Sequence, residues 1–297
     1  MKQCGYIAIV GRPNVGKSTL LNKILDYKVS ITSRKPQTTR HQIMGVKTLD
    51  QAQYIYVDTP GLHQVNPDQL NRYMNQAALS SLQDVDVILF VVALDQWNEG
   101  DEWVYQAIQR VNKPVILVVN KADRVHDGGQ RATFMAKLAD QTTIQQRLAV
   151  SAKQGHGIEK LEAKIRKHLP ESPVFHFDPD DVTDKSMRFL VAETIREKLM
   201  RLLGDEVPYQ LTVGVDNFKT QDNGAIVIDA TIYVARDSQK GIVIGKQGSR
   251  LKKVGIQSRV DIEAMLETRV FLQLWVKVKA DWSDDAQALA TFGYSTT

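Results

Sequence analysis

The sequence is poor in several features that define other classes of protein. Cys4 is its only cysteine, so no internal disulfide can form. We therefore expect a chain that folds in a reducing cytoplasm, with Cys4 as a small apolar residue of the first strand. Every apolar run falls short of the roughly 20 residues of a membrane-spanning helix, and we expect neither such a span nor a signal peptide.

The chain also has little excess of one charge, because 38 Lys+Arg and 34 Asp+Glu give a formal net charge of only +4. Residues 1–170 carry 22 Lys+Arg against 15 Asp+Glu, giving +7, whereas residues 171–297 carry 16 against 19, giving −3. Within this acidic second part, residues 236–259 hold seven basic residues and one acid, Asp237. A charge run is usually only a solvated surface, so a nucleic-acid partner needs support from other features.

What the sequence does contain is sufficient for two domains. Its 297 residues exceed the usual length of one domain, and a hydrophobic fraction of 43% suits packed cores. The segment "HLPESPVFHFDPDDVTD" (168–184) holds three prolines and several acids without any helical or alternating period. We predict a first domain over residues 1–169, a linker over 170–184 and a second domain over 185–297.

Continuous apolar runs predict an α/β first domain. The expected strands are "GYIAIV" (5–10), "QAQYIYVD" (51–58), "DVILFVV" (86–92) and "KPVILVVN" (113–120), with helix-like stretches such as 68–82 and 99–111 between them. This pattern indicates a mostly parallel sheet with helices on both faces. Ligand sites in such sheets lie at the carboxyl ends of the strands.

"GRPNVGKS" (11–18) follows the first strand and opens a helix. Its spacing of Gly, four residues and Gly-Lys-Ser is that of a P-loop, in which backbone N–H groups face phosphate, Lys17 reaches the β- and γ-phosphates and Ser18 binds magnesium. An ordinary strand–turn–helix is the alternative, and the flanking elements argue against it. The predicted nucleotide-binding residues here are Gly11, Arg12, Pro13, Asn14, Val15, Gly16, Lys17, Ser18 and Thr19.

"DTPG" (58–61) closes the next strand. Asp58 can reach magnesium through water, and the Gly61 N–H can face the γ-phosphate. The Thr38–Thr39 pair is ordinary loop composition by itself, but its place between the P-loop and Asp58 makes it a candidate metal ligand. We predict magnesium ligands at Ser18, Thr39 and Asp58, and further nucleotide contacts at Thr38, Thr59, Pro60 and Gly61.

"NKAD" (120–123) ends another strand and predicts the base. The Asp123 carboxylate can accept from guanine N1–H and the N2 amine, which adenine cannot match, and such a mismatch discriminates by about 10⁴-fold or more. Asn120 can serve the other edge of the base, and Lys121 can pack on the ring. "SAK" (Ser151, Ala152 and Lys153) can offer a backbone N–H to guanine O6. Together these motifs predict a domain that binds GTP and GDP.

These motifs and the segment "KVSITSRKPQTTRHQIMGV" (28–46) resemble the Era family, bacterial GTPases of the translation-factor-related class. The resemblance implies GTP hydrolysis with Lys17, Asn14 and Gly61 at the reacting phosphate. Leu62 stands where Ras-like proteins have a glutamine that orients water. Related GTPases with this replacement often use potassium held by an asparagine matching Asn14, whereas the alternative is that Asn14 only supports the turn. His63 and Gln64 are weak candidates for positioning water.

The second domain is predicted to be α+β. We expect a helix over 186–204 capped by Gly204, strands in 208–216 and 224–235, two short helices near 249–254 and 257–267, and a strand over 269–280. The order helix, strand, strand, helix–GxxG–helix, strand is that of a type II KH domain, whose GxxG loop clamps about four single-stranded nucleotides.

"KGIVIGKQGSRLKK" (240–253) carries this signature. A local basic patch suffices to neutralise RNA phosphates and makes binding salt-dependent. The predicted RNA-binding residues are Arg236, Lys240, Gly245, Lys246, Gln247, Gly248, Arg250 and Lys253. Bases are expected on the apolar floor between the helix and the third strand. Trp275 lies in that strand, where a core role is the alternative to stacking.

The resemblance covers about Cys4 to Tyr294 and implies a factor for small (30S) ribosomal subunit assembly. It implies binding to the single-stranded 3′ end of 16S rRNA and peripheral association with the inner membrane, and residues 28–42 and 58–75 as moving parts. Two alternatives stay open: a GTPase of tRNA modification or membrane signalling with a protein-binding second domain, and an RNA chaperone with vestigial nucleotide binding. We expect a monomer. "ALDQWNEGDEWV" (93–104) matches no motif.

Overall fold

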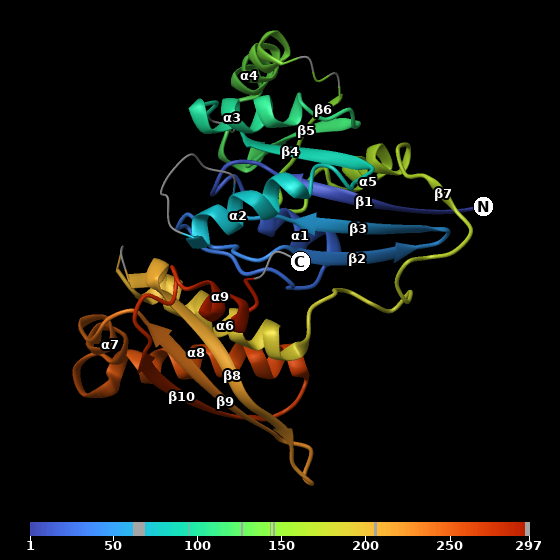
Figure 1. Cartoon of the computed structure of the whole chain (residues 1–297). Coiled ribbons are helices and arrows are strands. Elements are labelled where there is room, and N and C mark those ends of the chain that lie inside the picture. Colours follow the sequence, from blue (N-terminus) through green and yellow to red (C-terminus); the bar gives the residue numbers. More distant parts are fainter. Residues whose placement is uncertain are drawn as a thin grey trace. The chain divides into compact units, whose positions relative to one another are not determined.

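The computed structural model describes residues 1–61, 69–94, 96–125, 127–142, 144, 146–204 and 207–294 (Figure 1). The chain divides into two compact units. The first comprises Met1–Thr32, Thr39–Asn66 and Met74–Asp184, and the second comprises Ser33–Thr38, Pro67–Tyr73 and Lys185–Thr297. Among the described helices, none is long and apolar enough to cross a membrane.

The first unit is built on the mostly parallel sheet that the apolar runs predict. The strands are β1 (Lys2–Val10), β2 (Ile43–Leu49), β3 (Ala52–Asp58), β4 (Val87–Ala93), β5 (Val115–Asn120), β6 (Gln146–Ala149) and β7 (Glu171–Ser172). They follow the order β2-β3-β1-β4-β5-β6, and β7 pairs with β1. Among the described strands of this unit, only β2 and β7 run antiparallel to their neighbours. Neither was foreseen, because β2 has a short mixed pattern and β7 spans two residues.

Helices flank this sheet: α1 (Lys17–Leu25), α2 (Gln69–Ser80), α3 (Glu99–Ile108), α4 (Gly128–Gln141) and α5 (Ile158–Arg166) (Figure 1). Residues from α2, α3 and α4 pack with alternate strand residues such as Phe90 and Leu117 in one core. α1 buries Leu20, Leu21 and Ile24 and contacts β1 and β3. β3 and β4 are buried along their whole length, as expected of strands covered on both faces. Cys4 is buried in β1, as predicted.

The second unit has the predicted order of helix, strand, strand, helix, GxxG loop, helix and strand, but its helices over 237–244 and 286–291 lie where no helix range was predicted. It comprises α6 (Met187–Leu202), β8 (Leu211–Thr220), β9 (Ile226–Val234), α7 (Asp237–Ile244), α8 (Ser249–Leu266), β10 (Val270–Val278) and α9 (Ala286–Thr291). Its sheet has the order β10-β9-β8, with β10 parallel and β8 antiparallel to β9. The core collects apolar residues of α6, α8 and the three strands, including Ile195, Ile232 and Ile262.

Two local predictions in this unit are wrong. Residues 249–266 form one helix of 18 residues rather than two short ones. An interior glycine costs about 1 kcal/mol relative to alanine, but Val254, Ser258 and Ile262 are buried on the same helix, and this packing outweighs the penalty at Gly255. The second error concerns Gly204, because α6 ends at Leu202 and its C-cap is the extended residue Leu203.

The segment 170–184 is held along the first unit despite its irregular sequence. β7 pairs with β1, and the Val46 N–H donates to the carbonyl of Val182 over 2.8 Å. The fully buried side chain of Gln53 accepts from the N–H groups of His176 and Phe177 at 2.9 and 3.0 Å, and donates to the Phe177 carbonyl. A side chain thereby supplies the hydrogen bonds that a regular period would otherwise supply.

Candidate functional site

The loop between β1 and α1 has backbone conformations that its glycines make accessible. Gly16 has φ +100° and caps the start of α1, and Gly11 has φ +155°. A Cβ at Gly16 would lie 2.4 Å from Nδ2 of Asn120, and one at Gly11 would lie 2.3 Å from the Val91 carbonyl oxygen. Asn14 is also left-handed, at φ +65°. The loop is therefore tightly folded on the carboxyl ends of β4 and β5 and opens at the helix N-terminus, where anions bind.

Lys17 lies in this loop with its ammonium group turned back on the backbone. Its Nζ donates to the carbonyls of Gly11 and Arg12 over 2.9 and 3.1 Å. Burial lowers the pKa of Lys17 from 10.5 to about 8, although the nearby Asp58 carboxylate opposes this shift. Among the described residues, this buried ammonium donates to two carbonyls, which compensate its charge poorly, and a phosphate group in the loop would compensate it.

Three predicted metal ligands come together beside Lys17. Ser18 Oγ donates to Asp58 Oδ2 at 2.8 Å and lies 2.8 Å from Thr39 Oγ1. Burial raises the pKa of Asp58, whose Oδ1 has no hydrogen-bond partner among the described residues. Two hydroxyls and a buried carboxylate with an unsatisfied oxygen form the hard oxygen donor set that Mg²⁺ prefers, so these residues fit this cation.

Ser30 belongs to the same cluster, and the sequence contained no signal for it. Its Oγ donates to Asp58 Oδ2 at 2.8 Å, and the residue is almost fully buried. Asn22 of α1 holds Ser30 in place, because its Oδ1 accepts from the Ser30 N–H and its Nδ2 donates to the Ser30 carbonyl. A serine and an asparagine eight residues apart form no recognisable motif, and only the fold joins them.

The base-recognition motifs also converge. Ser151 Oγ donates to Asp123 Oδ1 at 2.6 Å, and this hydrogen bond lowers the pKa of Asp123. The carboxylate is therefore kept charged and partly exposed, as an acceptor for two ligand N–H groups must be. Lys121 Nζ donates to the Asn14 carbonyl over 2.6 Å, whereas Lys153 is exposed.

Asn120 has a structural role in addition to the base contact that we expect. Its Nδ2 donates to the Val15 carbonyl over 2.9 Å, and its Oδ1 accepts from the Ala152 N–H at 3.0 Å. Both ends of this buried amide thus join the P-loop to the "SAK" segment. Asn120 therefore supports the walls of the site, and a contact of its amide with the base stays a prediction.

The remaining predicted nucleotide contacts divide into two groups. Thr59 is buried and donates to the Ile9 carbonyl over 3.0 Å, and Thr38 donates to the Lys35 carbonyl over 2.7 Å, so both hydroxyls serve the protein backbone. Gly61 lies at the P-loop, because a Cβ there would be 2.9 Å from Pro13 Cα. Leu62, His63 and Gln64 lie outside the described residues.

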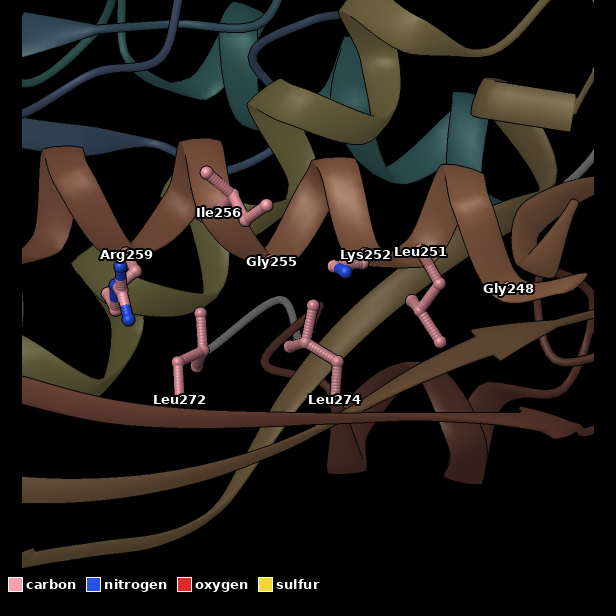
Figure 2. Close-up of a pocket in the computed structure, with 8 residues that line it drawn as sticks. All are labelled: Gly248, Leu251, Lys252, Gly255, Ile256, Arg259, Leu272 and Leu274. Carbon is pink, nitrogen blue, oxygen red and sulfur yellow. The ribbon is translucent and has the colours of Figure 1, made fainter.

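A pocket of about 400 Å³ lies between α8 and β10 in the second unit (Figure 2). Apolar side chains of Leu251, Leu272 and Leu274 point into it, and the Arg259 guanidinium lies at one end. The floor expected between the helix and the third strand is therefore present. The complete lining is Gly248, Leu251, Lys252, Gly255, Ile256, Arg259, Leu272 and Leu274.

Only Gly248 of the eight predicted RNA-binding residues lines this pocket. The others are Arg236, Lys240, Gly245, Lys246, Gln247, Arg250 and Lys253. Arg250 turns away, because it donates to the carbonyl of Ile242 in α7. Lys252, Gly255, Ile256 and Arg259 share one face of the continuous helix α8, at the spacing of helical neighbours. Because we predicted a break in this helix, we did not expect Lys252 and Arg259 on one face and did not include them among the RNA-binding residues.

The GxxG loop itself is positioned for a close approach. Gly245 has φ +72° and would clash with Arg250 Cβ at 2.8 Å if it carried a Cβ, whereas a Cβ at Gly248 would meet nothing within 4 Å. The space next to Gly248 is therefore open to a ligand. Trp275 is 43% exposed, does not line the pocket, and occupies a strand position opposite in phase to Leu272 and Leu274.

Fold and sites together define a two-domain protein, with a P-loop GTPase domain followed by a KH domain. Residues 6–121 match a family described as "50S ribosome-binding GTPase", and residues 206–283 match the KH domain family. GTPase Era of Pseudomonas fluorescens (strain Pf-5) is 52% identical over 98% of this chain and 97% of its own. GTPase Era of Pseudomonas entomophila is 51% identical with the same coverage of both chains.

Two solved structures are similar over their full length. Aquifex aeolicus Era bound to GDP·AlF4⁻ has 40% identity and a TM-score of 0.95, with 99% of this chain and 100% of that chain covered. Era in complex with MgGDPNP and nucleotides 1506–1542 of 16S ribosomal RNA has the same identity and TM-score and covers 100% of both chains. This chain belongs to the Era family of GTPases.

Proposed function

We propose that this GTPase is a nucleotide-driven switch that binds the single-stranded 3′ end of 16S rRNA through its KH domain and acts in 30S subunit assembly. The observation that carries this proposal is the buried Ser18–Thr39–Asp58 cluster at the P-loop, present in the same chain as an apolar pocket next to a GxxG loop. The Era complex with nucleotides 1506–1542 of 16S rRNA supports the choice of RNA. The proposed domains are residues 1–169 and 185–297, joined by 170–184.

At the nucleotide site, the N–H groups of the P-loop and the Lys17 ammonium bind the phosphates, and Asp123 selects guanine. Ser18 and Thr39 would hold Mg²⁺ directly and Asp58 through water, and the ion would supply positive charge to the phosphates. Catalysis of phosphoryl transfer depends mainly on positioning and charge. The Gly61 N–H would meet the γ-phosphate, and the closeness of Gly61 to Pro13 of the P-loop supports this role.

In the KH domain, the open backbone at Gly248 receives the sugar–phosphate chain, and Lys252 and Arg259 lie where phosphates or base edges would meet the pocket. Bases pack on Leu251, Leu272 and Leu274. The more distant predicted cations, Arg236, Lys240, Lys246 and Lys253, contribute through long-range attraction, so RNA affinity falls with salt.

The test is GTP hydrolysis at fixed potassium and salt, with an RNA matching the 3′ end of 16S rRNA or a scrambled oligonucleotide. A rate raised only by the matching RNA supports coupling of the two sites. Gly248→Asp should abolish this stimulation without changing the basal rate, because it places a carboxylate against the phosphate chain. Lys17→Ala should abolish hydrolysis while RNA binding persists. Equal rates with both RNAs would contradict the switch.

Three further expectations accompany this function. The left-handed backbone of Asn14 supports a role in the turn, and a comparison of hydrolysis in potassium and sodium, with Asn14→Asp, tests whether it also serves potassium. A cytoplasmic monomer is proposed, which light scattering during gel filtration checks. Peripheral association with the inner membrane is tested by flotation with lipid vesicles.

A further inference from the structure

An ion pair joins the P-loop to the start of α3, in the segment that matches no motif. Arg12 Nε donates to Asp101 Oδ2 over 2.8 Å. The Asp101 side chain is fully buried, and that of Arg12 is 17% exposed. Burial raises the pKa of Asp101, and the hydrogen bond and positive charge of the Arg12 guanidinium oppose this rise. A buried carboxylate is costly unless its partner is well placed, and the Arg12 guanidinium is the charged partner that the structure supplies.

The position of Asp101 is itself fixed by the helix terminus. Asp101 Oδ2 accepts from the Asn98 N–H at 3.2 Å, and Asn98 Oδ1 accepts from the N–H groups of Gly100 and Asp101. This reciprocal capping box holds the carboxylate in one orientation. The aliphatic stem of Arg12 lies along the same turn, because a Cβ at Gly100 would be 3.4 Å from Arg12 Cδ.

The segment that Arg12 anchors contacts two groups of the nucleotide site. The Arg12 carbonyl accepts from Lys17 Nζ at 3.1 Å. The next residue, Pro13, contacts Gly61, where a Cβ would lie 2.9 Å from Pro13 Cα. A displacement of Arg12 would therefore move both the backbone on which the Lys17 ammonium rests and the backbone on which Gly61 lies.

We propose that Asp101 is a positioning residue for GTP hydrolysis, which holds Arg12 and thereby sets the relative placement of Lys17 and Gly61. The proposal rests on the GTPase function stated above. Asp101 itself touches no reacting atom. Asp101 Oδ2 accepts from both the Asn98 N–H and the Arg12 guanidinium, so the carboxylate serves Arg12 in addition to the helix cap.

The test is Asp101→Asn. Asparagine has nearly the same shape as aspartate and keeps an oxygen for the Asn98 N–H, but it lacks the negative charge that faces the Arg12 guanidinium. We expect kcat to fall by about tenfold to a hundredfold, the scale of small misplacements in active sites. GDP affinity should change by less than about threefold, because the loop N–H groups and Lys17 remain. A loss in kcat at constant affinity indicates an interaction used in the transition state.

The matched control is Asp127→Asn, because Asp127 is likewise an acidic residue that caps a helix, α4, by accepting from the Gly129 N–H at 2.8 Å. Asp127→Asn should lower the melting temperature by about as much as Asp101→Asn does, since both substitutions weaken a helix cap, and it should leave kcat unchanged. A double variant, Arg12→Gln with Asp101→Asn, should be no slower than the slower single variant, since the two residues act as one unit.

A kcat within twofold of the wild type for Asp101→Asn would overturn the proposal, as would additive losses in the double variant. A parallel loss of GDP affinity, kcat and melting temperature would also overturn it in favour of a purely structural cap. Absence of hydrolysis in the wild type itself would instead contradict the proposed GTPase function, so the two failures are distinguishable.

Discussion

Replacing Asn120 by alanine tests the finding that this residue joins two walls of the nucleotide site. The substitution removes the hydrogen bonds to the Val15 carbonyl and from the Ala152 N–H, which are 2.9 and 3.0 Å long. Val15 and Ala152 are both buried, so water cannot fully replace the amide. Each of the two buried groups left unpaired costs about 1–3 kcal/mol, which predicts a loss of about 2–6 kcal/mol in the free energy of unfolding of the first unit.

GDP affinity should fall together with stability, because the loop that binds phosphate and the segment that borders the base both lose their support. The assay is urea unfolding of the full chain followed by circular dichroism, together with titration of a fluorescent GDP analogue. Asn120→Asp keeps an acceptor for the Ala152 N–H but sets a carboxylate against the Val15 carbonyl, so it should not rescue. Asn112→Ala, at an exposed site of the same unit, is the control and should change the unfolding free energy by less than about 0.5 kcal/mol. A loss below about 1 kcal/mol for Asn120→Ala, with GDP affinity within twofold of the wild type, would refute the reasoning.

Three further outcomes follow from the same geometry. Asp123→Asn should weaken GDP binding by about a hundredfold or more in a competition assay, because an amide cannot accept from both guanine N–H groups; an unchanged affinity would reject Asp123 as the base-selecting residue. GDP binding should weaken as the pH rises above about 8, where Lys17 loses its proton in the unliganded protein while phosphate favours the charged form. Calorimetry in two buffers at pH 9 should then detect proton uptake, and Lys17→Arg, which stays charged, should abolish it. Arg259→Ala should reduce RNA affinity in a filter-binding assay more than Lys253→Ala, because only Arg259 lines the pocket; the opposite order would place the RNA elsewhere.

Much of the nucleotide site could be predicted because its motifs follow parallel strands of one sheet. The carboxyl ends of β1, β3 and β5 meet at one edge, so residues far apart in the chain, such as Ser18 and Asp58, had to come close once the strands were recognised. The KH element order was predictable for a similar reason, since apolar periodicity and glycine turns are visible locally. The single helix α8 was missed because Gly255 reads as a local break, and packing overrode it.

The sequence by itself determined most of the segments that become strands and helices and where the two glycine loops lie, and it is the basis for expecting Asp123 to select guanine. These properties depend on side-chain period and on backbone conformations open to glycine, both of which act over a few residues. Only the tertiary structure decided that Asn120 supports the loops, that Ser30 holds Asp58, and that Asp101 pairs with Arg12. Which residues become partners in these hydrogen bonds depends on which polar groups the fold buries next to one another. A polar group removed from water must find a hydrogen bond among whichever residues the fold brings near, and no local pattern specifies which they are.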